Sequence, residues 1–460
     1  MSQKLTQVSV VPWKLENEDD HLIQISNQLS QQLQLQKDRQ LNLLLGKKNI
    51  SIKVQIAEIP PNEILLPEKM IKEFCLPLNR YKFFAKYDIE IDTLVLGPII
   101  GLVTDFHMKG EEEPHFRSIH AFCEELHQGI IKNGGFFYVF SFDQFPLLGF
   151  YMENGKWTPS ELPLPDVIYN RVHSRRLERE NSFQAFRNRL EQYNIPIFND
   201  RFLSKWEVYE QLIQEELLHS YIPETKIFSK ENLAEFLMKY KTVFIKPIHG
   251  SQGRNIIKLI KEEENYHLQA SLSAASNKII KINDSEDLYE QIKTIQGNRI
   301  YIIQQGISLL KFENCTLDFR ALCHKNRKNT WEVTSLVARI SHKDEFVSNI
   351  ARGGTVMNPL QALMTGMKKN RAQEIIARMK ELSIEMSSMV SHYSPGITGE
   401  LGIDIGVTPE GNLWLIEVNS KPSKKFEDGP GKIRPSAKAI LQFSTKLAFD
   451  TTSEKEDARK

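Results

Sequence analysis

The sequence contains few cysteines and no long apolar run. Its 460 residues include four scattered cysteines, Cys75, Cys123, Cys315 and Cys323, none of which forms a C-x-x-C pair. This spacing argues against a disulfide scaffold and against a cysteine-ligated zinc site. No run of 18 or more apolar residues occurs, so we expect no membrane-spanning helix. The N-terminus lacks a basic segment followed by an apolar one, so we expect a cytoplasmic protein.

An excess of one charge is also missing. The chain carries 59 Lys and Arg against 58 Asp and Glu, a net charge of +1. This balance argues against a nucleic-acid partner and against a disordered acidic chain. A composition of 41% hydrophobic and 25% charged residues is typical of a globular protein, and the length corresponds to about three domains. Any charge that serves a function must therefore be concentrated locally.

Turn residues and changes in the apolar pattern divide the chain into four segments. Residues 1–96 alternate short strand patterns with prolines, which predicts a small β-rich domain. Residues 97–199 contain strand, helix and strand patterns in series, which is typical of a parallel α/β domain. Residues 200–430 carry nearly all of the motifs below. Residues 431–460 predict a helix from Pro435 to Leu447 and a polar tail, and we find no convincing internal repeat.

A glycine-rich loop lies between two predicted strands. Lys246 ends the first strand, and the loop contains Gly250, Ser251, Gln252 and Gly253. Because a strand rather than a helix follows, the loop is neither a Walker A loop nor a dinucleotide-binding turn. Small residues allow backbone N–H groups to approach an anion, and Lys246 adds positive charge. This segment alone supports a phosphate site and a plain tight hairpin equally.

Two carboxylates and an amide are predicted to meet in a later hairpin. If Pro409 to Asn412 forms a four-residue turn, Asp404 faces Glu417. Asn419 then lies on the same face, because side chains alternate along a strand. Opposed carboxylates repel each other unless a cation compensates them, and oxygen ligands suit Mg²⁺. The alternative is an edge hairpin whose carboxylates face solvent; we favour the metal.

Single arginines interrupt apolar strand patterns. Arg320 and Arg339 lie within predicted strands, and Arg352 follows in a glycine-containing segment. A buried arginine needs a partner, since an unpaired buried charge is costly. The partner is either a phosphate or substrate carboxylate, which the guanidinium group binds bidentately, or Asp318 in a structural ion pair. For any one arginine alone, the structural pair is favoured.

An apolar strand also leads into a polar turn at Gln304, Gln305 and Ile307. An adenine could hydrogen-bond to backbone and amide groups at such a strand exit while the isoleucine packs on its face. Taken alone, this segment favours an ordinary strand end.

The order of these motifs resembles that of the ATP-grasp superfamily. The series is Lys205, Lys246-Pro247 with the Gly250–Gly253 loop, Gln304-Gln305-Gly306-Ile307, Asp318-Phe319-Arg320, Arg339, Asn349-x-x-Arg352-Gly353-Gly354, Asp404 and Glu417-x-Asn419. Within the superfamily, the chain is similar to the endospore coat-associated YheC/YheD family, also at Gly97–Gly101 and Leu164–Arg171. The resemblance implies a multidomain α+β and α/β fold. Two α+β lobes would hold ATP, preceded by a pre-ATP-grasp α/β domain and a small N-terminal β-rich domain.

The resemblance also implies roles for individual residues. The nucleotide would be bound by Lys205 and Lys246 at the phosphates, by Gly250, Ser251, Gln252 and Gly253 above them, and by Gln304, Gln305 and Ile307 at the adenine. Mg²⁺ would be held by Asp404, Glu417 and Asn419. Arg320 and Arg339 would stabilise the transferring group, and the loop of Arg352 would face the acceptor, as in RimK-type glutamate ligases. Many superfamily members carry a glutamate where this chain has Gln304 and Gln305.

These roles imply an ATP- and Mg²⁺-dependent carboxylate–amine ligase that forms a C–N bond through an acyl-phosphate. Its partners would be a small-molecule or peptide carboxylate and an amine acceptor. The family's coat association implies an alternative, an ATP-binding structural or assembly protein that contacts spore coat proteins and is associated with the spore. A kinase that uses the same fold is a third hypothesis. His249, His324 and His342 suggest no catalytic triad.

Overall fold

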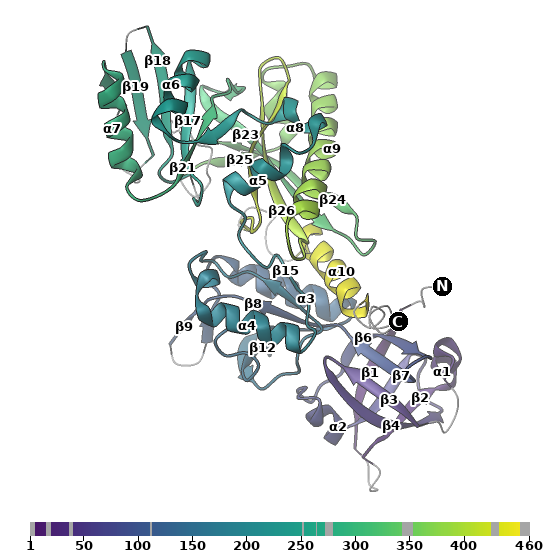
Figure 1. Ribbon diagram of the computed structural model, residues 1–460. Helices are drawn as coiled ribbons and strands as arrows, with labels where there is room; N and C mark the ends of the chain where they lie inside the picture. The colour runs from purple at the N-terminus through teal and green to yellow at the C-terminus, as the bar shows by residue number, and fades with distance from the viewer. Residues whose placement is uncertain are drawn as a thin grey trace.

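The structure is a computed structural model that describes residues 5–14, 20–35, 40–110, 113–250, 253–263, 265–271, 279–342, 353–424 and 432–450. These residues form an elongated molecule, with a barrel at one end, an α/β sheet in the middle and two lobes of sheet and helix at the other end (Figure 1). The predicted fold class is confirmed. Ser251, Gln252 and Arg352, which were predicted site residues, lie outside the described residues.

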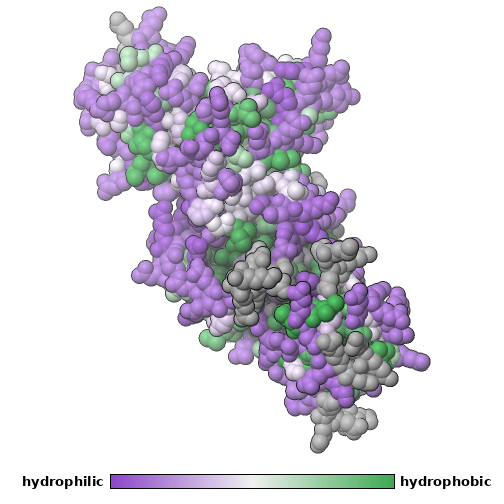
Figure 2. Space-filling view, turned by 45° about the vertical axis from the view of Figure 1, so that its right-hand side comes forward, coloured by the Kyte–Doolittle hydropathy of each residue, from purple (hydrophilic) through white to green (hydrophobic). Residues whose placement is uncertain are grey.

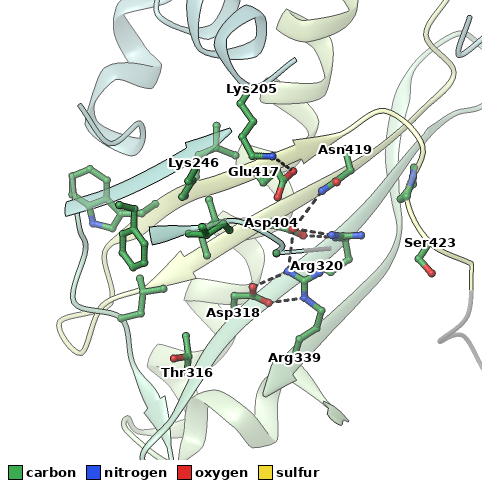
Figure 3. Close-up of a pocket in the computed structure, with 18 of the residues that line it drawn as sticks. Lys205, Lys246, Thr316, Asp318, Arg320, Arg339, Asp404, Glu417, Asn419 and Ser423 are labelled. Atoms are coloured by element: carbon green, nitrogen blue, oxygen red, sulfur yellow. Dashed lines mark hydrogen bonds and ion pairs between the residues drawn. The ribbon is translucent and has the colours of Figure 1, made fainter. Parts of the chain in front are cut away.

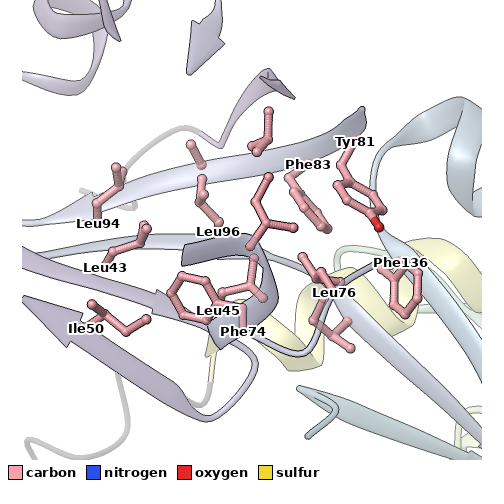
Figure 4. Packing of buried hydrophobic residues seen from close by; sticks show 14 of the residues in the cluster. Leu43, Leu45, Ile50, Phe74, Leu76, Tyr81, Phe83, Leu94, Leu96 and Phe136 are labelled. Atoms are coloured by element: carbon pink, nitrogen blue, oxygen red, sulfur yellow. The ribbon is translucent and has the colours of Figure 1, made fainter. Parts of the chain in front are cut away.

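The N-terminal segment forms a closed barrel of seven strands. They are β1 (Thr6–Trp13), β2 (Leu22–Ser26), β3 (Gln40–Leu45), β4 (Lys48–Ala57), β5 (Glu63–Pro67), β6 (Tyr81–Asp88) and β7 (Thr93–Gly97), in the order β1-β5-β2-β4-β3-β7-β6. Helices α1 (Asn27–Leu33) and α2 (Glu68–Glu73) follow β2 and β5. Alternate strand residues point inward, so leucine, isoleucine and aromatic side chains fill the interior (Figure 4).

The barrel contains a repeat that the sequence did not reveal. β5 begins 41 residues after β2 (residue 63 against 22), and β6 begins 41 residues after β3 (81 against 40). β1 pairs with β5 in parallel as β4 does with β2, and β3 pairs with β4 antiparallel as β6 does with β7. β2 and β5 share one pattern of buried and half-buried positions. The two halves thus repeat a pattern of burial and of strand pairing rather than particular residues. Many apolar sequences satisfy such a pattern, so the repeat is not visible in the sequence.

A six-stranded sheet with the order β13-β12-β11-β8-β14-β15 forms the middle domain. Its strands are β8 (Ile99–Val103), β11 (Phe136–Phe140), β12 (Gly149–Glu153), β13 (Lys156–Ser160), β14 (Val167–Asn170) and β15 (Ile197–Phe198), with the helices α3 (His120–Asn133) and α4 (Asn181–Gln192) and a separate ribbon of β9 (His107–Lys109) and β10 (Glu113–His115). β8 pairs in parallel with β11 and β14, which confirms the predicted strand–helix–strand unit. Phe136 of this sheet packs edge-on against Tyr81 of the barrel, with ring centres 5.8 Å apart (Figure 4).

Two sheets form the lobes at the other end of the molecule. The first lobe contains β16 (Thr225–Ile227), β17 (Thr242–Pro247), β18 (Ile257–Glu262), β19 (Asn265–Ala270), β20 (Ile279–Ile282) and β21 (Tyr301–Gln305) with α6 (Lys230–Lys239) and α7 (Ser285–Gln296). The second contains β22 (Lys311–Phe312), β23 (Cys315–Lys325), β24 (Trp331–Ile340), β25 (Thr355–Met357), β26 (Glu400–Val407) and β27 (Leu413–Asn419) with α8 (Pro359–Met364) and α9 (Lys369–Tyr393). Helix α5 (Lys205–Leu212) precedes the first lobe.

Helical spacing of apolar residues explains how α9 covers its sheet. Ile375, Met379, Leu382 and Met386 recur every three or four residues and are buried. The C-terminal helix α10 (Pro435–Asp450) contains the predicted helix and extends it. α10 contacts α3 and β14 of the middle domain and β23 and β24 of the second lobe, so it joins these two parts of the molecule (Figure 1).

Most of the exposed large hydrophobic side chains of the described residues are scattered over the molecule. No helix in the described ranges is long and apolar enough to cross a membrane. Hydrophilic residues predominate on the face shown in Figure 2. Exposed large hydrophobic residues such as Leu147 and Met238 lie in different domains, and scattered residues of this kind are normal on globular proteins.

A buried carboxylate links the middle domain to the second lobe. Glu400, at the start of β26, is fully buried. Its Oε2 accepts hydrogen bonds from Tyr169 at 2.5 Å and from Arg171 at 3.2 Å. Its Oε1 bonds to His324 at 2.9 Å and also to Lys424. Tyr169 lies in β14 and Arg171 directly follows it, so their two contacts with Glu400 cross from the middle domain to the second lobe.

We expect Glu400→Ala to destabilise the protein by about 3–5 kcal/mol, because Arg171 and Lys424 would stay buried without their counter-charge. Urea denaturation measures the change. Glu385→Ala, at an exposed position of α9, is the control and should leave stability nearly unchanged. A Glu400→Ala variant as stable as the control would contradict this role.

Candidate functional site

A cavity of about 950 Å³ lies between the two lobes and reaches the middle domain. Its volume suits a ligand the size of a nucleotide. Eleven of the predicted site residues line it: Lys205, Lys246, Gly253, Gln304, Gln305, Ile307, Arg320, Arg339, Asp404, Glu417 and Asn419. Gly250 is not part of the lining. The structure therefore brings most of the predicted residues to one place.

The hairpin that carries the predicted metal ligands has a different turn from the one expected. Thr408 N donates to Asn412 O at 3.0 Å, so three residues rather than four form the turn. This shorter turn alone would move Asp404 out of register with Glu417. A bulge at Ile416 inserts one residue into β27 and restores the Asp404–Glu417 pairing. The predicted turn is wrong, and the predicted pairing is confirmed.

The opposed carboxylates are compensated by cations of the chain itself (Figure 3). Arg320 donates to Asp404 through Nη2, at 2.7 Å, and through Nε. Glu417 Oε1 accepts a hydrogen bond from Lys205 Nζ at 2.6 Å. Burial favours the neutral form of Asp404, but Arg320 and Arg339 outweigh it and lower the pKa of this carboxyl below its usual value.

Arg339 bridges two carboxylates. Its Nε and Nη2 donate to Asp318 at 2.6 and 2.7 Å, and Nη2 lies 3.0 Å from Asp404 Oδ2. Burial opposes the charged form, yet the two carboxylates raise the pKa of Arg339 above its usual value. The structural pair with Asp318 that the sequence left open is present for Arg339. Arg320 instead pairs with Asp404, which lies directly opposite it across β23 and β26.

The donor set at the hairpin fits Mg²⁺. Asp404, Glu417 and Asn419 carry oxygen atoms on one face, and Asn419 Nδ2 lies 3.3 Å from Asp404 Oδ2. Carboxylate and amide oxygens, completed by phosphates, are typical Mg²⁺ ligands. No group of three His, Cys, Asp or Glu residues suited to a metal occurs in the part of the chain that the structure describes. This set contains two carboxylates and an amide, which suits a site that a nucleotide completes.

Lys246 lies on the cavity wall with an amide rather than an acid beside it. Its Nζ donates to Gln304 Oε1 at 2.6 Å, and it forms no ion pair with a carboxylate of the described residues. Burial, assisted by the charge of Lys205, lowers the pKa of Lys246 to about 8. Lys205 Nζ also lies 3.4 Å from Gly250 O, so Lys205 connects the glycine loop to Glu417.

The two predicted adenine-binding glutamines are already engaged. Gln304 Oε1 accepts from Lys246, and its Nε2 donates to Thr225 at 3.0 Å. Gln305 Oε1 accepts from Glu224 N at 3.3 Å. A base that bound to the oxygen of either carboxamide would share it with these donors. Ile307 lines the cavity with an apolar side chain, and the base-binding roles of all three residues stay predictions.

Sequence reasoning missed part of the lining. The missed residues include Arg171, His173, Phe244, Lys258, Lys311, Trp414 and Lys421. A signal existed for Arg171, because it directly follows β14, and ligands bind at the carboxyl ends of parallel strands. The lysines gave no such signal, since isolated surface lysines and cavity lysines look alike in a sequence.

Two α+β lobes around a cavity, with lysines in the first and an oxygen-donor hairpin in the second, define an ATP-grasp protein. More narrowly, the chain belongs to the family described as YheC/D like ATP-grasp, whose profile matches residues 194–447, more than half of the chain.

Two relatives and two solved structures illustrate the similarity. The endospore coat-associated protein YheD of Bacillus subtilis (strain 168) is 28% identical over 404 residues, 86% of this chain and 87% of that protein. YheC of the same organism is 26% identical over 283 residues, 60% of this chain and 76% of that protein. The ATP-grasp ligase PsnB with a minimal precursor has a TM-score of 0.45 at 13% identity, covering 76% of this chain and 100% of that one. The VanG D-Ala:D-Ser ligase of Enterococcus faecalis has a TM-score of 0.46 at 12% identity, covering 77% and 99%.

The low pKa of Lys246 predicts a pH dependence of stability. Its pKa is about 8 in the fold against 10.5 for an ordinary lysine. Between pH 8 and pH 10.5 the Lys246 side chain is therefore more protonated in the unfolded chain than in the folded one. Burial of the charged lysine lowers the free energy of unfolding below pH 8, and this loss of stability disappears as the pH rises from 8 to 10.5. We expect the stability of Lys246→Met relative to wild type to fall by about 2 kcal/mol between pH 8 and pH 10 in urea denaturation. Lys328→Met, at an exposed turn, should show no such change; a pH-independent difference for Lys246→Met would refute the shift.

Proposed function

We propose that the protein is an ATP- and Mg²⁺-dependent ligase that joins a carboxylate to an amine. One observation carries the proposal: the carboxylate pair of Asp404 and Glu417 shares a cavity with Lys205, Lys246 and the arginines of the second lobe. Such a cavity is suited to a triphosphate, whose charge needs both a metal and cationic side chains. Membership in an ATP-grasp family supports the same class of chemistry.

Each part of the cavity has a proposed task. Asp404, Glu417 and Asn419 hold Mg²⁺, which neutralises phosphate charge when it is bound. Lys205 and Lys246 face the phosphates, and the glycine loop lies beside Lys205. The ion pairs of Lys205 with Glu417 and of Arg320 with Asp404 keep the cations and the metal ligands together in the nucleotide-free chain. Ligand binding then exchanges the partners of these side chains.

The proposed reaction has two steps. A substrate carboxylate oxygen attacks the γ-phosphorus of ATP, the bond to the ADP oxygen breaks, and an acyl-phosphate and ADP form. The amine nitrogen then attacks the acyl carbon, the bond to the phosphate oxygen breaks, and a C–N bond forms as the nitrogen loses a proton. Arg320 and Arg339 match the negative charge of the transferring group by positioning and electrostatics. No side-chain nucleophile takes part.

The nucleotide site is tested by melting in the presence of Mg²⁺ and ADP. Wild type should be stabilised by about 2.7 kcal/mol at a hundredfold excess over the dissociation constant. Asp404→Asn and Glu417→Gln should weaken Mg·ADP binding at least tenfold, because each removes a charged oxygen ligand, and EDTA should reduce the wild-type shift. Glu385→Gln serves as the exposed control. A wild type with no nucleotide-dependent shift would count against the proposal.

A second candidate is an ATP-binding structural or assembly protein. It is favoured by the names of the relatives, which are coat-associated proteins, and by a barrel whose described residues do not line the cavity. Incubation with Mg·ATP and panels of carboxylates and amines separates the hypotheses. A ligase releases ADP and yields a product joined with loss of water, which mass spectrometry detects. ATP binding without ADP release favours the structural role, and a stable phosphorylated product favours a kinase.

A further inference from the structure

Three basic side chains from two domains meet beside the glycine loop. Arg175 follows β14, Arg179 ends the short 3-10 helix η2 (Leu177–Arg179), and His249 directly precedes Gly250. Arg175 Nη1 lies 3.4 Å from His249 Nδ1, and Arg179 Nη2 lies 2.8 Å from His249 Nε2. The contact therefore joins the middle domain to the loop of the first lobe.

One imidazole cannot satisfy both guanidinium groups. Arginine offers only donors, and a neutral imidazole has one acceptor nitrogen, so one arginine N–H faces another N–H in either tautomer. Neither Arg175 nor Arg179 forms an ion pair with a carboxylate within the described ranges. An oxyanion between the three side chains would let all of them donate.

The three side chains are not part of the cavity lining, but the cluster lies next to it. The guanidinium carbon of Arg175 is 5.0 Å from the ring centre of Phe202, which lines the cavity. The negative charge of Glu417, a proposed metal ligand, acts on Arg175. Burial lowers the pKa of Arg175, and burial together with the two arginines lowers the pKa of His249. Glu178 and Glu207 also act on Arg175, so carboxylates compensate the cluster from a distance, without an ion pair to either arginine in the described residues.

We propose that Arg175, Arg179 and His249 form an oxyanion site for either the terminal phosphoryl group of the nucleotide or an anionic group of the substrate. Guanidinium groups bind both kinds of oxyanion through paired N–H donors. The inference rests on the proposed function and adds to it a contribution from the middle domain. Because Arg175 and Arg179 belong to that domain and His249 to the first lobe, an anion bound here holds the two together.

Calorimetric titration of the full chain tests the site with three probes: Mg·ADP, the ATP analogue Mg·AMP-PNP, and inorganic phosphate added to the ADP-loaded protein. The test variant is Arg175→Gln/Arg179→Gln. The matched control is Arg176→Gln, whose side chain in the same segment is 86% exposed and pairs with Glu180. A loss of at least tenfold for AMP-PNP, with ADP within twofold, supports the terminal phosphoryl group. A loss of at least tenfold for phosphate alone supports a substrate anion.

Unchanged binding of all three probes by the folded double variant would overturn the proposal, as would an equal loss in Arg176→Gln. If the double variant does not fold, Arg179→Gln alone keeps the test valid, because Arg179 is exposed, and it should weaken the affected probe at least threefold. A failure of the proposed function can be distinguished from a failure of the oxyanion site. A wild type that binds neither nucleotide refutes the ligase. The oxyanion site is still supported if the nucleotide-free wild type binds pyrophosphate and the double variant does not.

Discussion

The buried charge of Glu400 is the constraint on which the arrangement of the cavity depends. A carboxylate out of water is tolerated only while its partners stay within bonding distance, so Tyr169 and Arg171 fix the middle domain against the second lobe. Asp404 lies four residues further along the same strand, about 13 Å away and on the same face. The contacts that hold the domains together therefore also set where the proposed metal ligand stands relative to the middle domain.

Much of the cavity site could be predicted from the sequence through the alternation of side chains along strands and the residues of local turns. Asp404 and Glu417 could be paired because both lie in one hairpin, although the turn was shorter than expected and the bulge at Ile416 corrected it. The residues around Ile416 do not by themselves predict such a bulge, because it is defined only by the pairing of β27 with β26. The partnership of Arg320 with Asp404 was out of reach for a related reason. It depends on β23 lying beside β26, and sheet order between strands so distant in sequence is set by tertiary packing.

The positive charge of the cavity was also only partly predictable from the sequence. The chain is nearly neutral overall, yet its cavity is lined by eight Lys and Arg against three Asp and Glu. Composition could indicate only that functional charge must be local. The sequence motifs located the lysines at 205 and 246, but Lys258, Lys311 and Lys421 join them only in the folded chain. The surplus suits polyanionic ligands, and one of its members, Lys205, adds to the burial that lowers the pKa of Lys246.

The repeated unit of the barrel has a consequence for how the N-terminal domain assembles. Each half contributes strands to the other: β1 of the first half pairs with β5 of the second, and β2 of the first with β4 of the second. Neither half can close a sheet alone, and each would expose unpaired strand edges that invite pairing with another chain. The halves are thus interlocked rather than stacked. A cut between β3 and β4 would produce two complementary fragments that need each other to fold, not two smaller domains.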